Sequence, residues 1–109
     1  MIVAVTGGKG GVGKSTVSVE LGAALDATVV DADLGMADLP TGPGPDLHDV
    51  LAGQADPIEA VREGCGPVRL LPCGRSIAGA RAADVAALEG TLRAVEDVYG
   101  DVVVDCPAG

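Results

Sequence analysis

The chain has 109 residues, 48% of them hydrophobic, and a formal net charge of −9 from 16 acidic and seven basic side chains. This length suits one compact domain and excludes a two-domain protein. Its one aromatic residue, Tyr99, provides no stacking platform for bases. Its negative charge repels phosphate backbones and anionic membranes, so we do not expect this stretch to contact either through a basic surface.

Cysteine usage and hydropathy point to the cytoplasm. The three cysteines, Cys65, Cys73 and Cys106, form no CxxC pair, which argues against a disulfide framework or a zinc knuckle. The first residues lack a basic leader, and no apolar run approaches the ~18 residues of a membrane span. We therefore expect a soluble cytoplasmic protein, which in a longer form is peripheral at a membrane.

Only two of the basic residues are lysines, Lys9 and Lys14, and both lie in one glycine-rich segment. An acidic, lysine-poor composition is typical of salt-adapted proteins, because a dense carboxylate surface stays hydrated when electrostatic screening is strong. A GC-rich coding sequence explains the same composition equally well. The concentration of both lysines in one segment is the first indication of function.

The first half of the chain predicts two strands with a helix between them. The apolar run 2–6 is followed at once by glycines, which is typical of a buried parallel strand. A second strand is expected over 28–32, and the proline-rich and glycine-rich segment 40–45 must be a loop. The helix between the strands follows Gly13, and its apolar face is expected to comprise Val17, Leu21, Ala24 and Leu25.

Two short helices are expected next, each with an acidic residue at its N-cap. Asp46 precedes the first, over 47–52. Asp56 precedes the second, which begins at Pro57 and ends near Gly64; proline at the first helical position and a glutamate two residues later are typical of such a start.

The last part of the chain predicts a strand, a longer helix and a strand. The strands are expected over 68–71 and 102–104, the second ending at Asp105. The helix between them stops at Gly100, and its apolar positions are Val85, Leu88, Leu92 and Val95.

This alternation of strands and helices predicts a mostly parallel sheet in a three-layer α/β/α domain. Such a sheet needs helices over both faces, yet the chain stops soon after the fourth strand, where a covering helix should begin. We therefore expect residues 1–109 to be the N-terminal part of a larger α/β domain.

Residues 8–15, GKGGVGKS, satisfy the phosphate-binding loop pattern G-x-x-x-x-G-K-[ST] between a predicted strand and a predicted helix. Its glycines let backbone N–H groups approach phosphate oxygens, and the start of the helix adds unpaired N–H groups and a positive dipole end. Lys14 provides a cation for the β- and γ-phosphates, and the Ser15 hydroxyl is placed to bind Mg²⁺.

Three segments resemble the deviant Walker A ATPases of the MinD/ParA family. Residues 9–16, KGGVGKST, match the family loop K-G-G-x-G-K-[ST]. Residues 30–39, VDADLGMADL, resemble the first switch of the MinD branch, and residues 105–109, DCPAG, are similar to the second switch, D-x-P-A-G. The resemblance covers this whole chain but only about the first half of a family domain. It implies that residues 1–109 are the N-terminal part of a single P-loop ATPase domain, incomplete at its C-terminus.

The resemblance implies a role for each matching residue. Lys9 would reach the phosphates bound by the other subunit of an ATP-dependent dimer, Lys14 would hold the β/γ oxygens, and Thr16 would contact the α-phosphate. The nucleotide-binding residues implied are Lys9, Gly10, Gly11, Val12, Gly13, Lys14, Ser15 and Thr16.

The metal and the attacking water would be held by carboxylates at strand ends. Ser15 would bind Mg²⁺ directly, Asp105 would hold it through water, and Asp31 is expected among the same metal-binding residues. Asp33 would position the attacking water, so the catalytic residues implied are Lys9, Lys14 and Asp33. The three aspartates could instead be ordinary strand-end turn formers, but strand ends are where open parallel sheets bind ligands.

Several other polar residues have simpler interpretations. Asp38 is either a loop residue or a switch contact, and His48 is expected to be solvated or to cap a helix. Cys106 is expected to be a small buried hydrophobic residue. Arg75 and Arg81 are expected to be solvated, with a dimer contact as the alternative.

The resemblance implies a dimerisation switch that binds ATP and Mg²⁺, hydrolyses ATP slowly, and positions the division site or a cargo. Its partner would be a second copy or a related full-length ATPase; the activator protein is unknown, and no membrane or DNA contact is encoded in this stretch. Two alternatives stay open. One is an iron–sulfur carrier or nitrogenase-reductase-like ATPase, and the other is a truncated nucleotide-binding module without catalysis.

Overall fold

The computed structural model describes residues 1–5, 14–32, 44–63, 68–73 and 82–106. Its sheet has four strands in the order β1-β4-β2-β3, and every neighbouring pair is parallel. The strands are β1 (Ile2–Val5), β2 (Thr28–Asp31), β3 (Arg69–Leu71) and β4 (Val102–Asp105).

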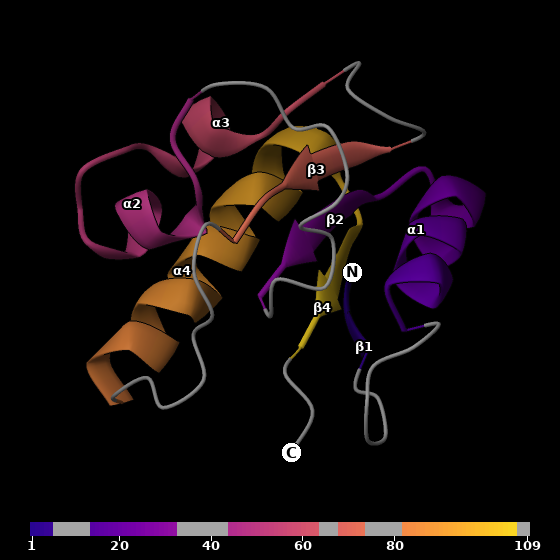
Figure 1. Cartoon of the computed structure of the whole chain (residues 1–109), viewed down its shortest axis with the longest axis horizontal. Coiled ribbons are helices and arrows are strands. Elements are labelled where there is room, and N and C mark those ends of the chain that lie inside the picture. The colour runs from indigo at the N-terminus through magenta and orange to yellow at the C-terminus, as the bar shows by residue number, and fades with distance from the viewer. Residues whose placement is uncertain (6–13, 33–43, 64–67, 74–81, 107–109) are drawn as a thin grey trace.

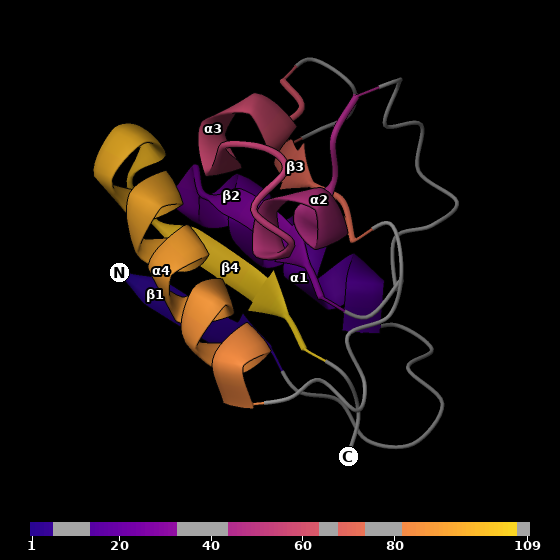
Figure 2. The same ribbon diagram turned by 90° about the vertical axis from the view of Figure 1, so that its left-hand side faces the viewer.

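Helices cover both faces of this sheet. Figure 1 shows α1 (Lys14–Leu25) on one side, and Figure 2 shows α4 lying across the opposite side beside the two shorter helices. That second side carries α2 (Leu47–Leu51), α3 (Pro57–Ala60) and α4 (Ala82–Tyr99). The predicted three-layer α/β/α arrangement with a parallel sheet is therefore confirmed. Among the described helices, none is long and apolar enough to cross a membrane.

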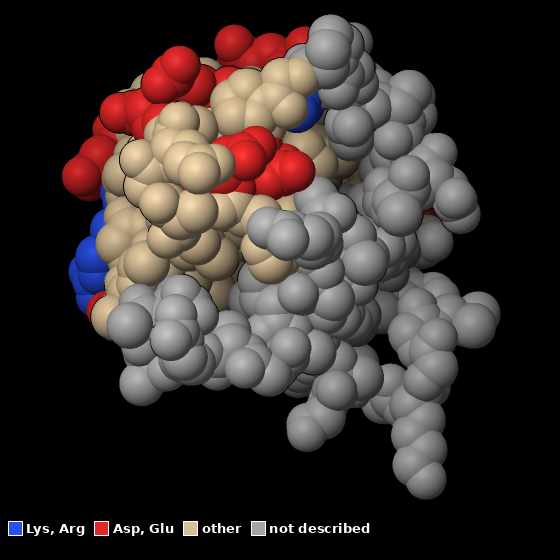
Figure 3. Space-filling view, turned by 60° about the vertical axis from the view of Figure 1, so that its left-hand side comes forward, with Lys and Arg blue, Asp and Glu red and all other residues tan. Residues whose placement is uncertain are grey.

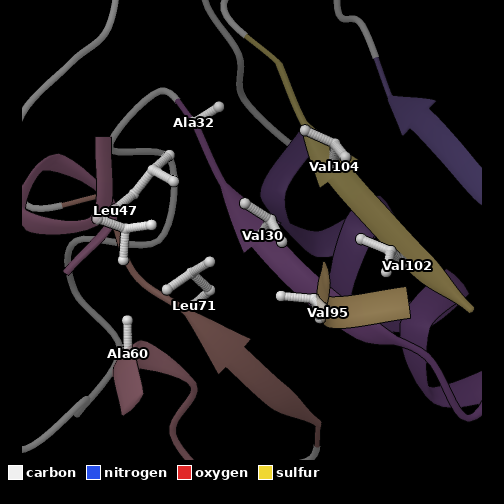
Figure 4. Close-up of a cluster of buried hydrophobic side chains, with 9 residues drawn as sticks. Val30, Ala32, Leu47, Ala60, Leu71, Val95, Val102 and Val104 are labelled. Carbon is white, nitrogen blue, oxygen red and sulfur yellow. The ribbon is translucent and has the colours of Figure 1, made fainter. Parts of the chain in front are cut away.

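The core consists of two clusters, one on each face of the sheet. Alternate strand residues enter each, because successive side chains of a strand point to opposite faces. On the α1 face, Val29 and Val103 pack with Leu70 and Ala27. Figure 4 shows the other cluster, which joins strand residues to α2, α3 and α4: Val30, Ala32, Leu47, Ala60, Leu71, Val95, Val102 and Val104.

The two predicted N-caps are confirmed, but the second short helix ends earlier than expected. Asp46 and Asp56 each form a capping box with the residue three positions later. The second helix stops at Ala60 instead of near Gly64 because the next residues are extended. Arg62 there forms an antiparallel bridge with Leu70, with N–H to carbonyl distances of 2.7 and 3.0 Å. The chain after α3 thus pairs with β3.

The first strand is parallel as predicted but is not fully buried. It pairs with β4 alone among the described strands, and its residue Ala4 is exposed. Val102 and Val104 of the neighbouring β4 are enclosed. The apolar run correctly predicted a parallel strand, while its burial depends on neighbours that the run does not specify.

The predicted apolar face of α1 is partly wrong. Val17 is 52% exposed, and Ala24 is exposed as well. The helix instead turns Ser18 and Gly22 fully toward the sheet. The apolar residues of this helix are distributed over several of its faces, so their spacing alone did not identify the buried face.

Gly22 marks a close approach of α1 to β2. A Cβ atom at this position would lie 2.5 Å from Cγ2 of the fully buried Val29. We expect Gly22→Ala to lower the free energy of unfolding by about 1–3 kcal/mol, because the crowded valine cannot move without disturbing the core. The measurement is urea unfolding followed by circular dichroism.

Gly90 provides the matched control, since it lies within α4 and a Cβ there meets no atom within 4 Å. Gly90→Ala should raise the free energy of unfolding by about 0.5–1 kcal/mol, through the lower entropy of alanine in the unfolded chain. If both substitutions changed the free energy of unfolding in the same direction, that result would contradict the close packing of α1 on β2.

Candidate functional site

Two aspartates lie side by side where the central strands end. Asp31 is the last residue of β2 and Asp105 the last of β4, and the two are register partners in adjacent parallel strands. They are 2% and 0% exposed, respectively. Neighbouring strands lie about 4.8 Å apart, so two carboxylates share a small buried region at this edge of the sheet.

Both carboxylates belong to the face of the sheet that α1 covers. Val29 and Val103, two residues before them, pack in the cluster on the α1 face. Because side chains alternate along a strand, Asp31 and Asp105 point to the same side as these valines. They therefore face the side from which the first helix starts.

Backbone hydrogen bonds hold the ends of three strands together at this edge. The N–H of Ala32 donates to the Asp105 carbonyl (2.9 Å), and the N–H of Cys106 donates to the Val5 carbonyl (3.0 Å). Val5 and Asp105 are also register partners. The first strand thus ends, at Val5, beside the strand that ends at Asp105.

The first helix begins at Lys14, as the loop motif predicts, and its first turn contains no acidic residue. The first N–H groups of a helix have no partner within the helix, and the helix dipole places a partial positive charge there. This helix start favours an anion, while the two carboxylates at the strand ends favour a cation. A metal-bound phosphate satisfies both.

The carboxylate pair suits a hard divalent cation. Mg²⁺ prefers oxygen ligands and is commonly bound through one or two carboxylates together with substrate phosphates. In the described part of the chain, no group of three or more His, Cys, Asp or Glu side chains could hold a metal by itself. A site made from Asp31 and Asp105 therefore needs oxygens from elsewhere, such as a hydroxyl or a phosphate.

Many of the predicted site residues lie outside the described residues. These are Lys9, Gly10, Gly11, Val12, Gly13, Asp33, Asp38, Arg75 and Arg81. For Lys14, Ser15 and Thr16 the structure describes the helical backbone but not the side chains. The roles of all of these residues remain predictions from the sequence.

His48 differs from its prediction, because it neither caps a helix nor lies free in solvent. Asp46 caps α2, and the Nε2 atom of His48 is enclosed, with no hydrogen-bond partner in the described structure. Its backbone N–H donates to the Cys73 carbonyl (3.3 Å), which joins α2 to the chain after β3. Cys106 is half-buried and packs against the core, close to its prediction.

Comparison with known proteins identifies the family of this chain. Residues 3–104 match the family model of the CobQ/CobB/MinD/ParA nucleotide-binding domain. The chain belongs to this family. The match extends from the first strand to the last, so both aspartates of the pair are either within it or immediately beside it.

Sequence relatives of this family member include proteins from archaea and bacteria. An uncharacterized ATP-binding protein of Methanocaldococcus jannaschii is 40% identical over 117 residues, covering 98% of this chain and 44% of the relative. The antiactivator FleN of Pseudomonas aeruginosa is 35% identical, covering 99% and 43%, and the septum site-determining protein MinD of Synechocystis is 32% identical, covering 99% and 45%. The chain thus spans a little less than half the length of these relatives.

Solved structures show the same fold. Cobyrinic acid a,c-diamide synthase from Mycobacterium smegmatis, with bound ADP and magnesium, has a TM-score of 0.76 at 31% identity, covering 97% of this chain and 50% of that one. MinD from Pyrococcus horikoshii, complexed with Mg-ADP, has a TM-score of 0.73 at 30% identity, covering 99% and 49%. Both relatives therefore contain a magnesium nucleotide.

Proposed function

We propose that this chain provides the phosphate- and metal-binding half of an ATPase of the MinD/ParA type. The observation that supports it most is the register pair Asp31 and Asp105, buried at the sheet edge where α1 starts and facing that helix. The GKGGVGKS loop joins the first strand to the same helix. Phosphate-binding and metal-binding chemistry therefore meet at one place.

ATP and Mg²⁺ are the proposed ligands. Backbone N–H groups of the loop and of the first turn of α1 bind the phosphates, Lys14 contacts the β- and γ-oxygens, and Thr16 contacts the α-phosphate. Ser15, Asp31 and Asp105 hold the metal, which when bound neutralises charge on the phosphates. Asp33, two residues beyond β2, orients the attacking water.

Lys9 points to a dimer. Because Lys14 already serves the phosphates of its own subunit, a second lysine in the same loop is useful chiefly for the nucleotide of another copy or of a related full-length ATPase. ATP binding then controls association, and slow hydrolysis reverses it. A role in positioning the division site or a cargo is part of this proposal; the activating protein and the surface on which the dimer works are left open.

The proposal is tested by phosphate release at increasing protein concentration. Turnover per chain should rise with concentration, because the active form contains two copies. We expect the 109-residue chain to hydrolyse ATP barely or not at all, and a version extended to the length of its relatives to recover activity. Full turnover by the 109-residue chain that is independent of concentration would instead indicate a self-contained monomeric NTPase.

A further inference from the structure

The face of the molecule formed by α2, α3 and α4 is strongly acidic. Figure 3 shows Asp and Glu side chains gathered over this side of the molecule. On these helices and their flanks the carboxylates are exposed or half-buried: Asp49, Asp56, Glu59, Glu63, Glu89, Glu96, Asp97 and Asp101. Wherever the structure describes burial, Arg93 is the one exposed basic side chain, and it pairs with Glu89 at 3.0 Å.

The other two described arginines do not neutralise this surface, because both are half-buried and bind groups inside the fold. Arg62 donates to the carbonyls of Pro45 and Ala60. Arg69 donates to the hydroxyl of Thr28 (3.0 Å) and to the carbonyl of Asp26 (2.9 Å). Both lysines of the chain lie in the phosphate loop. Among the described residues, the acidic face is thus offset only by Arg93 and by the N-terminal ammonium, which pairs with Glu96 and Asp101, so the face keeps a net negative charge.

Folding therefore concentrates negative charges that the unfolded chain keeps apart. Screening extends over about 10 Å at 0.1 M salt and about 3 Å at 1 M, so only concentrated salt weakens repulsion between carboxylates on neighbouring helices. The core that must overcome this repulsion is made of small side chains: valine and alanine provide ten of its 14 buried hydrophobic residues, and none is aromatic. Burial of such side chains yields less free energy each than burial of large ones.

We infer that the fold requires a salt-rich solvent, with dissolved monovalent cations at about molar concentration acting as counterions of the acidic face. This inference concerns the surface charge and is independent of the proposed ATPase activity. It favours salt adaptation over a GC-rich coding sequence as the explanation of the excess acidic residues. A compositional bias alone does not explain why two of the three described arginines, Arg62 and Arg69, bind groups within the fold.

Thermal unfolding of the 109-residue chain in KCl tests the inference. Between about 0.1 M and about 2 M KCl the unfolding midpoint should rise by about 10 °C or more. Where the chain is unfolded at the lower concentration, far-ultraviolet circular dichroism should show it folding as KCl is added. A midpoint that is constant or falls with KCl, or a chain that stays unfolded at every concentration, would overturn the inference.

Charge variants separate screening from a general salt effect on hydrophobic burial. Glu63 and Asp97 are exposed carboxylates of the acidic face outside the ion pairs and caps, and replacing them with Gln and Asn removes two negative charges. This double variant should have a higher unfolding midpoint at low KCl and a smaller rise of the midpoint with KCl than the unsubstituted chain. Arg93→Gln adds one net negative charge, so its unfolding midpoint should rise more with KCl than that of the unsubstituted chain. Equal rises in all three proteins would overturn the inference.

Discussion

Asp33→Ala is expected to reduce ATP turnover by about 10²–10⁴-fold while leaving nucleotide affinity nearly unchanged. In the sequence Asp33 comes two residues after β2, whose last residue belongs to the buried aspartate pair. A carboxylate that orients the attacking water stabilises the transition state and does not contribute to binding of the phosphates. The measurement is phosphate release at saturating Mg·ATP by the extended protein, together with calorimetric titration of Mg·ADP.

Asp46→Ala is the control for a loss of activity that is caused by reduced stability alone. Asp46 caps α2, and its carboxylate accepts a hydrogen bond from the Asp49 N–H (3.0 Å). Removing this cap should lower stability by about 1 kcal/mol and preserve most of the turnover. Normal turnover in Asp33→Ala, or an equal loss of turnover and binding, would remove Asp33 from the proposed role.

Local features of the fold were predictable because short-range chemistry determines them. The caps at Asp46 and Asp56, the start of α1 after the glycines and the end of β4 at Asp105 all follow from neighbouring residues. The resemblance to the MinD/ParA switches also singled out both members of the buried aspartate pair, and their place at strand ends agrees with where open parallel sheets bind ligands.

Features that depend on distant residues were not predictable in this way. The strand order places β4 between β1 and β2, and only this order makes Asp31 and Asp105 register partners. Similarly, the burial of Ser18 and Gly22 depends on how closely α1 approaches the sheet, and the early end of α3 depends on the pairing of Arg62 with β3. Helical spacing contains no information on either contact.

Lys14→Ala should weaken binding of Mg·ADP by roughly 10–150-fold, as expected when a charge-assisted contact of about 1.5–3 kcal/mol is lost. Lys14 is the first residue of α1, the helix that covers the face of the sheet carrying Asp31 and Asp105. The same loop offers a matched control in Lys9. If Lys9 serves the nucleotide of the other subunit, Lys9→Ala should leave the affinity of a single chain for Mg·ADP almost unchanged and should reduce dimerisation and turnover together.

Calorimetric titration of Mg·ADP into the 109-residue chain tests whether the strand ends and the start of α1 form a magnesium-nucleotide site. We expect saturable binding at one site per chain, weak because this chain provides only the phosphate and metal half of the site. Lys14→Ala should lower the affinity for Mg·ADP, and Lys9→Ala should not. No binding by the unsubstituted folded chain, or equal affinity in the unsubstituted and Lys14→Ala proteins, would contradict such a site.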